Sequence, residues 1–163
     1  MPVTVTKNGL DIDGQLYPLH SGSAHYWRLE REVWPLMMDR FIEMGFRFLS
    51  TYVPWSVHEL EKGSFDFGEE DTRKDLDAFL RLCKIKGLFV LLRPGPHINA
   101  KLTFFGYPER IFNTKDLLSR TAEGTPAIVP APPRFFPAPS YASTLFYDEV
   151  AGWFDAVCPI IRK

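Results

Sequence analysis

The residues best placed to interact with a ligand stand in one run, residues 93–100, which reads RPGPHINA. Proline is excluded from central ladder positions, so the two prolines of this run end a strand. The glycine between them lets the backbone turn without a Cβ penalty. The run and the residue after it then present His97, Asn99 and Lys101 above the sheet, where their polar groups can form hydrogen bonds. This pattern is typical of a ligand-binding loop.

The elements that position this run occur twice along the chain. An amphipathic helix is followed by a glycine, a hydrophobic strand, and a strand end rich in proline, aromatic and polar residues. The strand and its end occupy residues 46–55 in the first copy and residues 88–97 in the second. Alternating helices and buried strands build parallel sheets, and the loops beyond the carboxyl ends of the strands carry the chemistry. Function is therefore expected at residues 52–59 and 93–102.

The helices are predicted from apolar residues that recur at helical spacing. They cover residues 31–44, 72–86 and 141–157, and Gly45 and Gly87 end the first two. At the amino end, residues 3–5 and 10–16 are predicted to form short strands around an Asn8-Gly9 turn. Residues 125–139 hold six prolines in fifteen positions, which predicts a long loop without any regular element.

At three segments the chain resembles the glycoside hydrolase family 35 β-galactosidases, which are TIM-barrel enzymes. Residues 21–28 (SGSAHYWR) are similar to the family's first barrel strand, and residues 51–59 (TYVPWSVHE) to its second. Residues 93–100, with Gly106 and Pro108 after them, are similar to the end of the third. The order and spacing of the three segments extend the likeness over nearly the whole chain.

The resemblance implies an α/β fold, a partial TIM barrel of the first three βα units preceded by a short N-terminal β-hairpin. A complete barrel needs roughly 250 residues, and the chain has 163. All of residues 1–163 are then the N-terminal portion of a catalytic domain. Its expected parts are the hairpin at 1–19, three strands with their helices at 20–112, a proline-rich loop at 113–140 and a helix before the fourth strand at 141–158.

The family's proton-donating glutamate follows the fourth barrel strand, and its nucleophilic glutamate follows the seventh. Both are expected beyond Lys163, so no catalytic residue is assigned, and the chain alone is predicted to be inactive. Glu59 stands at a strand end but matches a family position that is not catalytic. It is expected to have a structural role, such as a hydrogen bond or a helix contact.

Four residues are predicted to bind the sugar because of the resemblance. Tyr52 matches a tyrosine that contacts the sugar, and Asn99 and Ala100 match a contacting loop, through the Asn99 side chain and the Ala100 backbone amide. Lys101 stands where the family has a sugar-binding glutamate, so an acceptor has become a donor. For Tyr52 the alternative of a buried aromatic residue with a satisfied hydroxyl stays open.

Composition excludes several other classes of protein. Nineteen basic and twenty acidic side chains give a net charge of −1 without a basic block that would attract nucleic acid. No apolar run approaches the ~20 residues that span a membrane, and no secretory leader is evident, which predicts a cytoplasmic protein. Cys83 and Cys158 lack the spacing of zinc ligands, and His25, His58 and His97 lie at three different strand ends. No metal or cofactor is expected.

Two functions of different classes remain. The first is a β-galactosidase-like glycoside hydrolase that acts on O-glycosyl bonds, here without its catalytic glutamates. The alternative is a non-catalytic galactoside-binding or assembly module, which would self-associate through the open edges of its sheet. A doubly wound nucleotide-binding domain is disfavoured because no glycine-rich phosphate loop follows the first strand.

Overall fold

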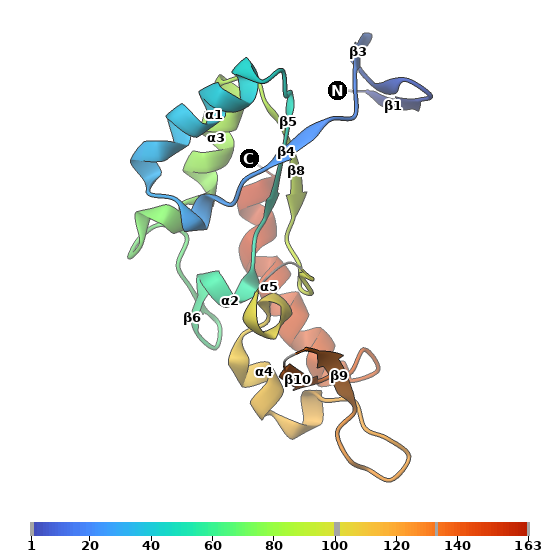
Figure 1. The fold of residues 1–163 in the computed structure, drawn as a ribbon. Helices are drawn as coiled ribbons and strands as arrows, with labels where there is room; N and C mark the ends of the chain where they lie inside the picture. The colour runs from blue at the N-terminus through green and yellow to red at the C-terminus, as the bar shows by residue number, and fades with distance from the viewer. Residues whose placement is uncertain (1, 100–101, 133, 163) are drawn as a thin grey trace. The chain divides into compact units, whose positions relative to one another are not determined.

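The computed structural model describes residues 2–99, 102–132 and 134–162 and has a mixed α/β fold (Figure 1). The chain forms two compact units. Unit 1 comprises Met1–Tyr52 and Asp71–Arg93, and unit 2 comprises Val53–Glu70 and Pro94–Lys163.

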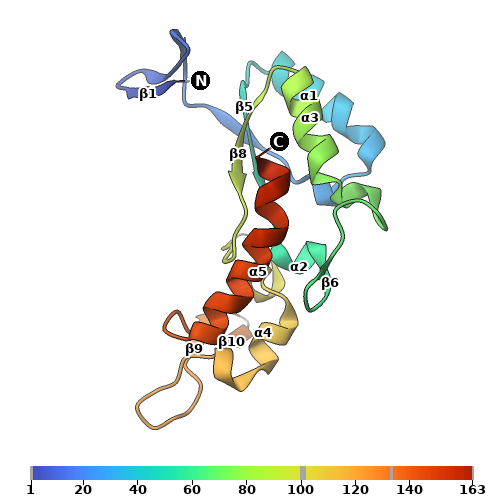
Figure 2. The same cartoon turned by 180° about the vertical axis from the view of Figure 1, so that it is seen from behind.

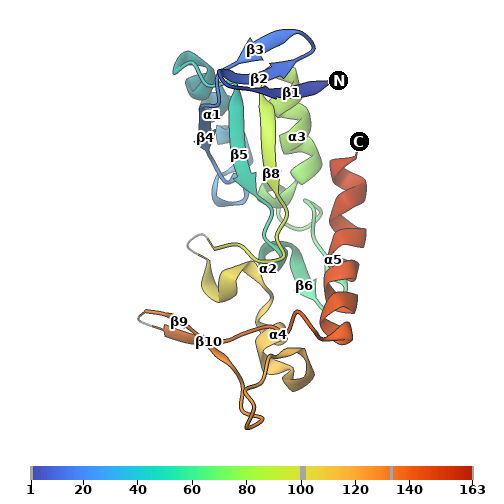
Figure 3. The same cartoon turned by 90° about the vertical axis from the view of Figure 1, so that its right-hand side faces the viewer.

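The centre of unit 1 is a three-stranded parallel sheet in the order β4-β5-β8. Its strands are β4 (Ser21–Ser23), β5 (Phe48–Tyr52) and β8 (Phe89–Arg93). The register pairs Phe48 with Phe89 at the start of the two longer strands, and Tyr52 with Arg93 at their end. Figure 3 shows α1 (Trp34–Glu43) and α3 (Leu76–Ile85) beside this sheet. The predicted pattern of helix, glycine and strand is confirmed for both copies.

The helices of unit 1 begin with a tighter turn than the apolar pattern predicts. The 3₁₀ turns η2 (Arg31–Val33) and η3 (Thr72–Lys74) precede α1 and α3. Asp75 caps α3, because its side chain accepts a hydrogen bond from the Ala78 amide at 2.8 Å. Gly45 and Gly87 follow the two helices with φ values of +85° and +69°, as predicted for glycines that end helices.

The core of unit 1 is aromatic. Tyr26, in the short 3₁₀ helix η1 (Tyr26–Arg28), is fully buried with Trp34 and Phe79. The Trp34 and Phe79 rings meet edge to face at 5.3 Å, and the Trp34 indole donates a hydrogen bond to the Tyr26 carbonyl at 3.3 Å. This packing holds α1 and α3 next to η1, the segment that follows β4.

The amino end of unit 1 forms an antiparallel sheet of three strands, where the sequence predicts two. These strands are β1 (Val3–Thr6), β2 (Gly9–Ile12) and β3 (Gln15–Tyr17). The predicted strand at 10–16 is wrong, because Asp13 and Gly14 form a tight turn with φ values of +52° and +82°. Tyr17 then packs against Phe48 and Phe89, at the amino ends of β5 and β8.

Unit 2 is built from helices, 3₁₀ turns and two small antiparallel ribbons. Its elements are α2 (Trp55–His58), β6 (Glu59–Glu61), β7 (Ser64–Phe65), η4 (Thr103–Gly106), α4 (Glu109–Asn113), η5 (Lys115–Leu117), β9 (Ile128–Ala131), β10 (Arg134–Pro137) and α5 (Thr144–Ile161). Figure 2 shows the length of α5, which begins three residues later than predicted and ends beyond Val157. Its Trp153 ring stacks on Trp55 at 6.2 Å, and both are fully buried.

The prediction that residues 125–139 contain no regular element is wrong. β9 and β10 pair in an antiparallel ribbon, with Pro130 opposite Phe135 and Pro137 opposite Ile128. Proline is tolerated here because each strand of a two-stranded ribbon has one free edge, where a missing N–H costs nothing. Phe136 anchors the ribbon, since its ring contacts the rings of Phe104, Phe105 and Phe112.

Candidate functional site

Two of the four predicted sugar-binding residues, Tyr52 and Asn99, lie in the described part of the chain. Tyr52 is the last residue of β5, in unit 1, and is half-buried. Asn99 belongs to unit 2, where it is exposed in the loop after β8. Ala100 and Lys101 lie outside the described residues.

Around Tyr52, unit 1 brings together residues from the ends of all three parallel strands. Arg93 donates a hydrogen bond from Nη1 to the Tyr52 hydroxyl at 3.0 Å, and its Cζ lies 5.3 Å from the centre of the ring. The pairing of Tyr52 with Arg93 in the sheet register brings the two side chains together. Sequence reasoning identified Arg93 only as the start of the loop, although both residues end predicted neighbouring strands.

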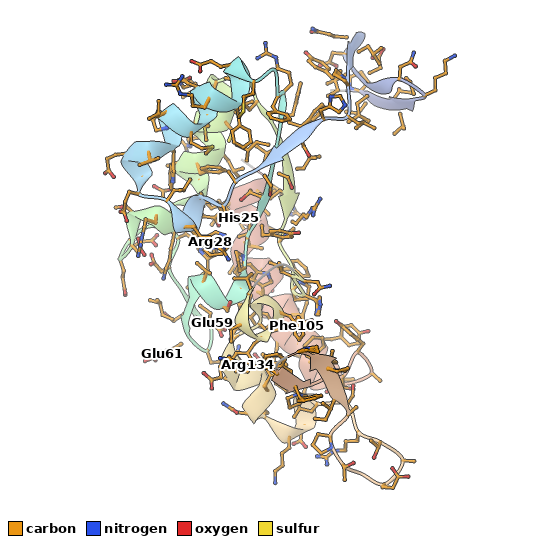
Figure 4. The ribbon with its side chains drawn as sticks, viewed as in Figure 1. His25, Arg28, Glu59, Glu61, Phe105 and Arg134 are labelled. Atoms are coloured by element: carbon orange, nitrogen blue, oxygen red, sulfur yellow. The ribbon has the colours of Figure 1, made fainter. Side chains whose placement is uncertain are left out.

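The segment after β4 completes this group. The His25 ring lies 5.2 Å from the Tyr52 ring and stacks on Trp27 at 5.6 Å. The Trp27 indole donates a hydrogen bond to the Tyr52 carbonyl at 3.3 Å, and the Arg28 guanidinium lies 4.5 Å over the Trp27 ring. Figure 4 labels His25 and Arg28 beyond the end of β4. We call His25, Trp27, Arg28, Tyr52 and Arg93 the strand-end cluster.

The electrostatics of the strand-end cluster favour a neutral imidazole. Burial, and then the positive charge of Arg28, lower the pKa of His25 below its ordinary value. The Nδ1 atom of His25 is buried and has no hydrogen-bond partner among the described residues. Residues 21–28, 48–52 and 89–93 contain no Asp or Glu. The cluster therefore offers hydroxyl, imidazole and aromatic groups, which can bind a polar ligand, but no carboxylate that could act as acid or nucleophile.

The loop after β8 is shaped by aromatic packing within unit 2. The His97 ring stacks on Phe105 at 5.0 Å and meets the Tyr107 ring at 5.7 Å, and burial lowers the pKa of His97. Phe104 and Phe105 have φ values of +53° and +54°, a left-handed conformation that is rare outside glycine. Asn99 keeps its exposed side chain beside this packed segment, where it is accessible to a ligand.

Glu59 has the structural role expected for it. Its carboxylate accepts two hydrogen bonds from Arg110, and only 3% of its side chain is exposed. Arg110 also binds Glu149 on α5 at 2.7 Å, and Lys62 donates to the same carboxylate. Figure 4 labels Glu59 on β6. A hollow of about 510 Å³ lies beside this network and is lined in part by Glu59, Arg110 and Phe104.

The described residues contain no group of three or more His, Cys, Asp or Glu side chains that could hold a metal ion. His58 instead hydrogen-bonds through Nδ1 to the Asp66 carbonyl at 2.8 Å, and the two cysteines are not bonded to each other. Among the helices of the same residues, none has the length and apolar character needed to cross a membrane.

Comparison of the sequence with known proteins identifies the family of the chain. The model of the glycosyl hydrolases family 35 matches residues 9–125. An exo-β-D-glucosaminidase of Thermococcus kodakarensis is 32% identical over 93% of the chain and 19% of its own length. The β-galactosidase-1-like protein 3 of Rattus norvegicus is 41% identical over 60% of the chain and 15% of its own length. The β-galactosidase 11 of Arabidopsis thaliana is 39% identical over 73% of the chain and 14% of its own length. The chain thus spans about a fifth or less of these relatives, and it belongs to family 35 of the glycosyl hydrolases.

Proposed function

We propose that the chain supplies the sugar-binding part of a β-galactosidase-like glycoside hydrolase that acts on O-glycosyl bonds. The observation that carries the proposal is the position of Tyr52, whose hydroxyl is held at the carboxyl end of the middle parallel strand of a family 35 chain. Hydroxyl groups and aromatic faces at such strand ends are what a sugar needs for binding.

The proposal includes the architecture of the complete domain. β4, β5 and β8 would be the first three strands of a TIM barrel, with the β1–β3 sheet before them and α5 leading to a fourth strand. In such barrels the binding groups lie at the carboxyl ends of the strands. Tyr52 and Asn99 each follow or end one of these strands, and Ala100 and Lys101 continue the second loop.

Hydrolysis would require a pair of groups that the described residues of the strand-end cluster do not offer. Retaining and inverting glycosidases use two carboxyl groups, one on each side of the scissile bond. The strand-end cluster contains no carboxyl group, and the Glu59 carboxylate already accepts hydrogen bonds from Arg110. We therefore propose that residues 1–163 bind a galactoside without cleaving it, and that both catalytic glutamates of the active protein lie in later barrel units.

The relatives' names differ in the sugar and the reaction that they specify. Among relatives that cover 93% of the chain, one is named an exo-β-D-glucosaminidase and one, from Ignavibacterium album, a β-1,2-glucosyltransferase. We propose a galactoside because the segment around Tyr52 resembles β-galactosidases, and a comparison of galactose binding with glucosamine and glucose binding tests this choice. We further propose a cytoplasmic protein without nucleic-acid or membrane partners.

A second function rests on the two open edges of the parallel sheet. β4 and β8 each lack one neighbour within the described residues, and Leu91 of β8 is 38% exposed. Exposed edges of this kind pair with other chains. A non-catalytic galactoside-binding or assembly module would therefore form a defined oligomer. Light scattering and a cooperative thermal transition at several protein concentrations would support this alternative.

The primary proposal is tested with the purified 163-residue chain in two assays. A chromogenic β-galactoside should release no product above a buffer blank. Saturation-transfer NMR should show binding of D-galactose in preference to D-glucosamine and D-glucose, and Tyr52→Phe should weaken it. Robust turnover of the chromogenic substrate would refute the proposal that the chain lacks a catalytic pair. Equal saturation-transfer signals from the wild type and Tyr52→Phe would show that the Tyr52 hydroxyl does not contribute to binding.

A further inference from the structure

The hydrogen bond between Arg93 and Tyr52 can run in only one direction. A guanidinium has five N–H donors and no acceptor, so the Tyr52 hydroxyl must accept from Arg93 Nη1 at 3.0 Å. We propose that Arg93 is a positioning residue that makes Tyr52 a hydrogen-bond donor to a sugar hydroxyl. This inference rests on the proposed function and adds the direction of the contact.

The phenol has a proton left to donate. A tyrosine hydroxyl both donates and accepts, and Arg93 occupies its accepting side. Within the described residues of unit 1, no acceptor takes the Tyr52 proton. Donation to a ligand oxygen is therefore the use that the geometry leaves for this proton.

Several contacts fix the orientation of the pair before a ligand arrives. Arg93 is held by both the hydroxyl and the face of the Tyr52 ring, with Cζ 5.3 Å from the ring centre. His25 packs at 5.2 Å against the same ring, and Trp27 donates to the Tyr52 carbonyl. A donor that is already oriented loses less conformational freedom on binding, which favours affinity.

The direction of the bond affects which sugar derivatives bind. A sugar hydroxyl can donate or accept, but a fluorine in its place can only accept, and a hydrogen can do neither. If Tyr52 donates, the deoxyfluoro derivative at the contacted position keeps part of the affinity that the deoxy derivative loses. If Tyr52 accepted instead, both derivatives would bind equally poorly.

The test titrates the 163-residue chain with D-galactose and with its monodeoxy and monodeoxyfluoro derivatives at each hydroxyl, followed by ligand-observed NMR. At one position the fluorinated sugar should bind better than the deoxy sugar. Arg93→Met should weaken galactose binding roughly two- to tenfold, the range for loss of one hydrogen bond. It should also reduce the advantage of the fluorinated sugar, because the Tyr52 hydroxyl is then no longer held in the donating orientation. Arg93→Lys keeps a donor to the hydroxyl and should retain more of that advantage than Arg93→Met.

The matched control is Arg40→Met. Arg40 is another arginine of unit 1, 66% exposed on α1, where it pairs with Glu43. This variant should bind every sugar as the wild type does, and circular dichroism should show all variants folded. Galactose binding that Arg93→Met leaves unchanged, with the same order of derivatives, would overturn the role of Arg93 and leave the proposed function standing. No galactose binding by the wild type would overturn both.

Discussion

Arg110 donates two hydrogen bonds to Glu59, from Nε to Oε2 at 2.9 Å and from Nη2 to Oε1 at 2.7 Å. The two residues are 51 positions apart in the sequence. The third guanidinium nitrogen, Nη1, binds Glu149 at 2.7 Å, so Arg110 on α4 connects the start of β6 with α5. Two-point pairing of this kind fixes geometry as well as charge.

Removing Arg110 should destabilise the protein. Arg110→Met leaves the Glu59 carboxylate, 3% exposed, without its cation, and an unpaired buried charge is costly. We expect a loss of about 2–4 kcal/mol in the free energy of unfolding by urea titration. Arg110→Lys keeps the positive charge but not the two-point hydrogen bonding, and it should lose less stability than Arg110→Met. The exposed Arg120→Met is the control, and an Arg110→Met midpoint equal to that of the control would contradict the prediction.

Acid should weaken the same network through Glu149. Burial acts to raise the pKa of Glu149, but hydrogen bonds from Lys62 and Arg110 outweigh it and hold the pKa below its ordinary value of 4.5. Because the unfolded state then takes up a proton first, the ion pairs stabilise the protein fully above about pH 4.5 and lose their effect as the pH falls through the folded-state pKa.

The measurement compares urea midpoints of the wild type and Glu149→Gln across this pH range. The wild type should be the more stable near neutrality, and the difference should shrink in acid. Comparison with the variant is needed because burial also lowers the pKa values of His25 and His97, whose protonation weakens the fold in both proteins. A difference that stays constant with pH would show that Glu149 is not the titrating group.

The helices and parallel strands could be predicted because their signals are local. Apolar spacing and the glycines at 45 and 87 locate α1, α3 and the strands after them. The β9–β10 ribbon could not be predicted, because proline content argues against strands unless a free edge is known to exist. The link from Glu59 through Arg110 to Glu149 carries no local signal, since it joins segments that meet only after folding.

In the strand-end cluster, too, some residues could be predicted from local sequence and others could not. Tyr52 and Asn99 follow from the strand ends and the resemblance, whereas the partner of Tyr52 follows from sheet register. Tyr52 lies opposite Arg93 because Phe48 lies opposite Phe89, and a shift by one residue would separate the side chains. The local sequence around Tyr52 and Arg93 does not reveal this register, because it depends on how the two strands align after folding.

Gly22 should resist replacement by alanine. A Cβ at this position of β4 would lie 2.1 Å from Cε1 of Phe41 on α1, so the helix packs directly on the strand backbone. Overpacking of this kind costs about 1–3 kcal/mol. Urea titration of Gly22→Ala should show that loss, and Phe41→Leu in the same chain should recover part of it. A double-mutant cycle with no coupling energy between positions 22 and 41 would show that Phe41 does not pack tightly on Gly22.

Asp75 should contribute to stability in two separable ways. It caps α3 by accepting from the Ala78 amide at 2.8 Å, and it pairs with Arg31 at 2.9 Å. Asp75→Ala removes both interactions and should cost about 1–2 kcal/mol in thermal or urea unfolding. Asp75→Asn keeps a capping oxygen and loses only the exposed ion pair, which is worth at most about 1 kcal/mol. Equal losses in the two variants would assign the whole effect to the ion pair.

In a completed barrel, Lys101→Glu should tighten galactose binding. The prediction comes from the resemblance alone, in which a sugar-binding glutamate occupies this position, and Lys101 lies outside the described residues. An ammonium can donate to a sugar hydroxyl but cannot accept, and a hydrogen bond to a charged group is worth about 1.5–3 kcal/mol, at least roughly tenfold in affinity. Calorimetry with D-galactose should therefore rank Lys101→Glu above Lys101→Gln and both above the wild type. Equal or weaker binding by Lys101→Glu would mean that the lysine suits the sugar that this chain binds.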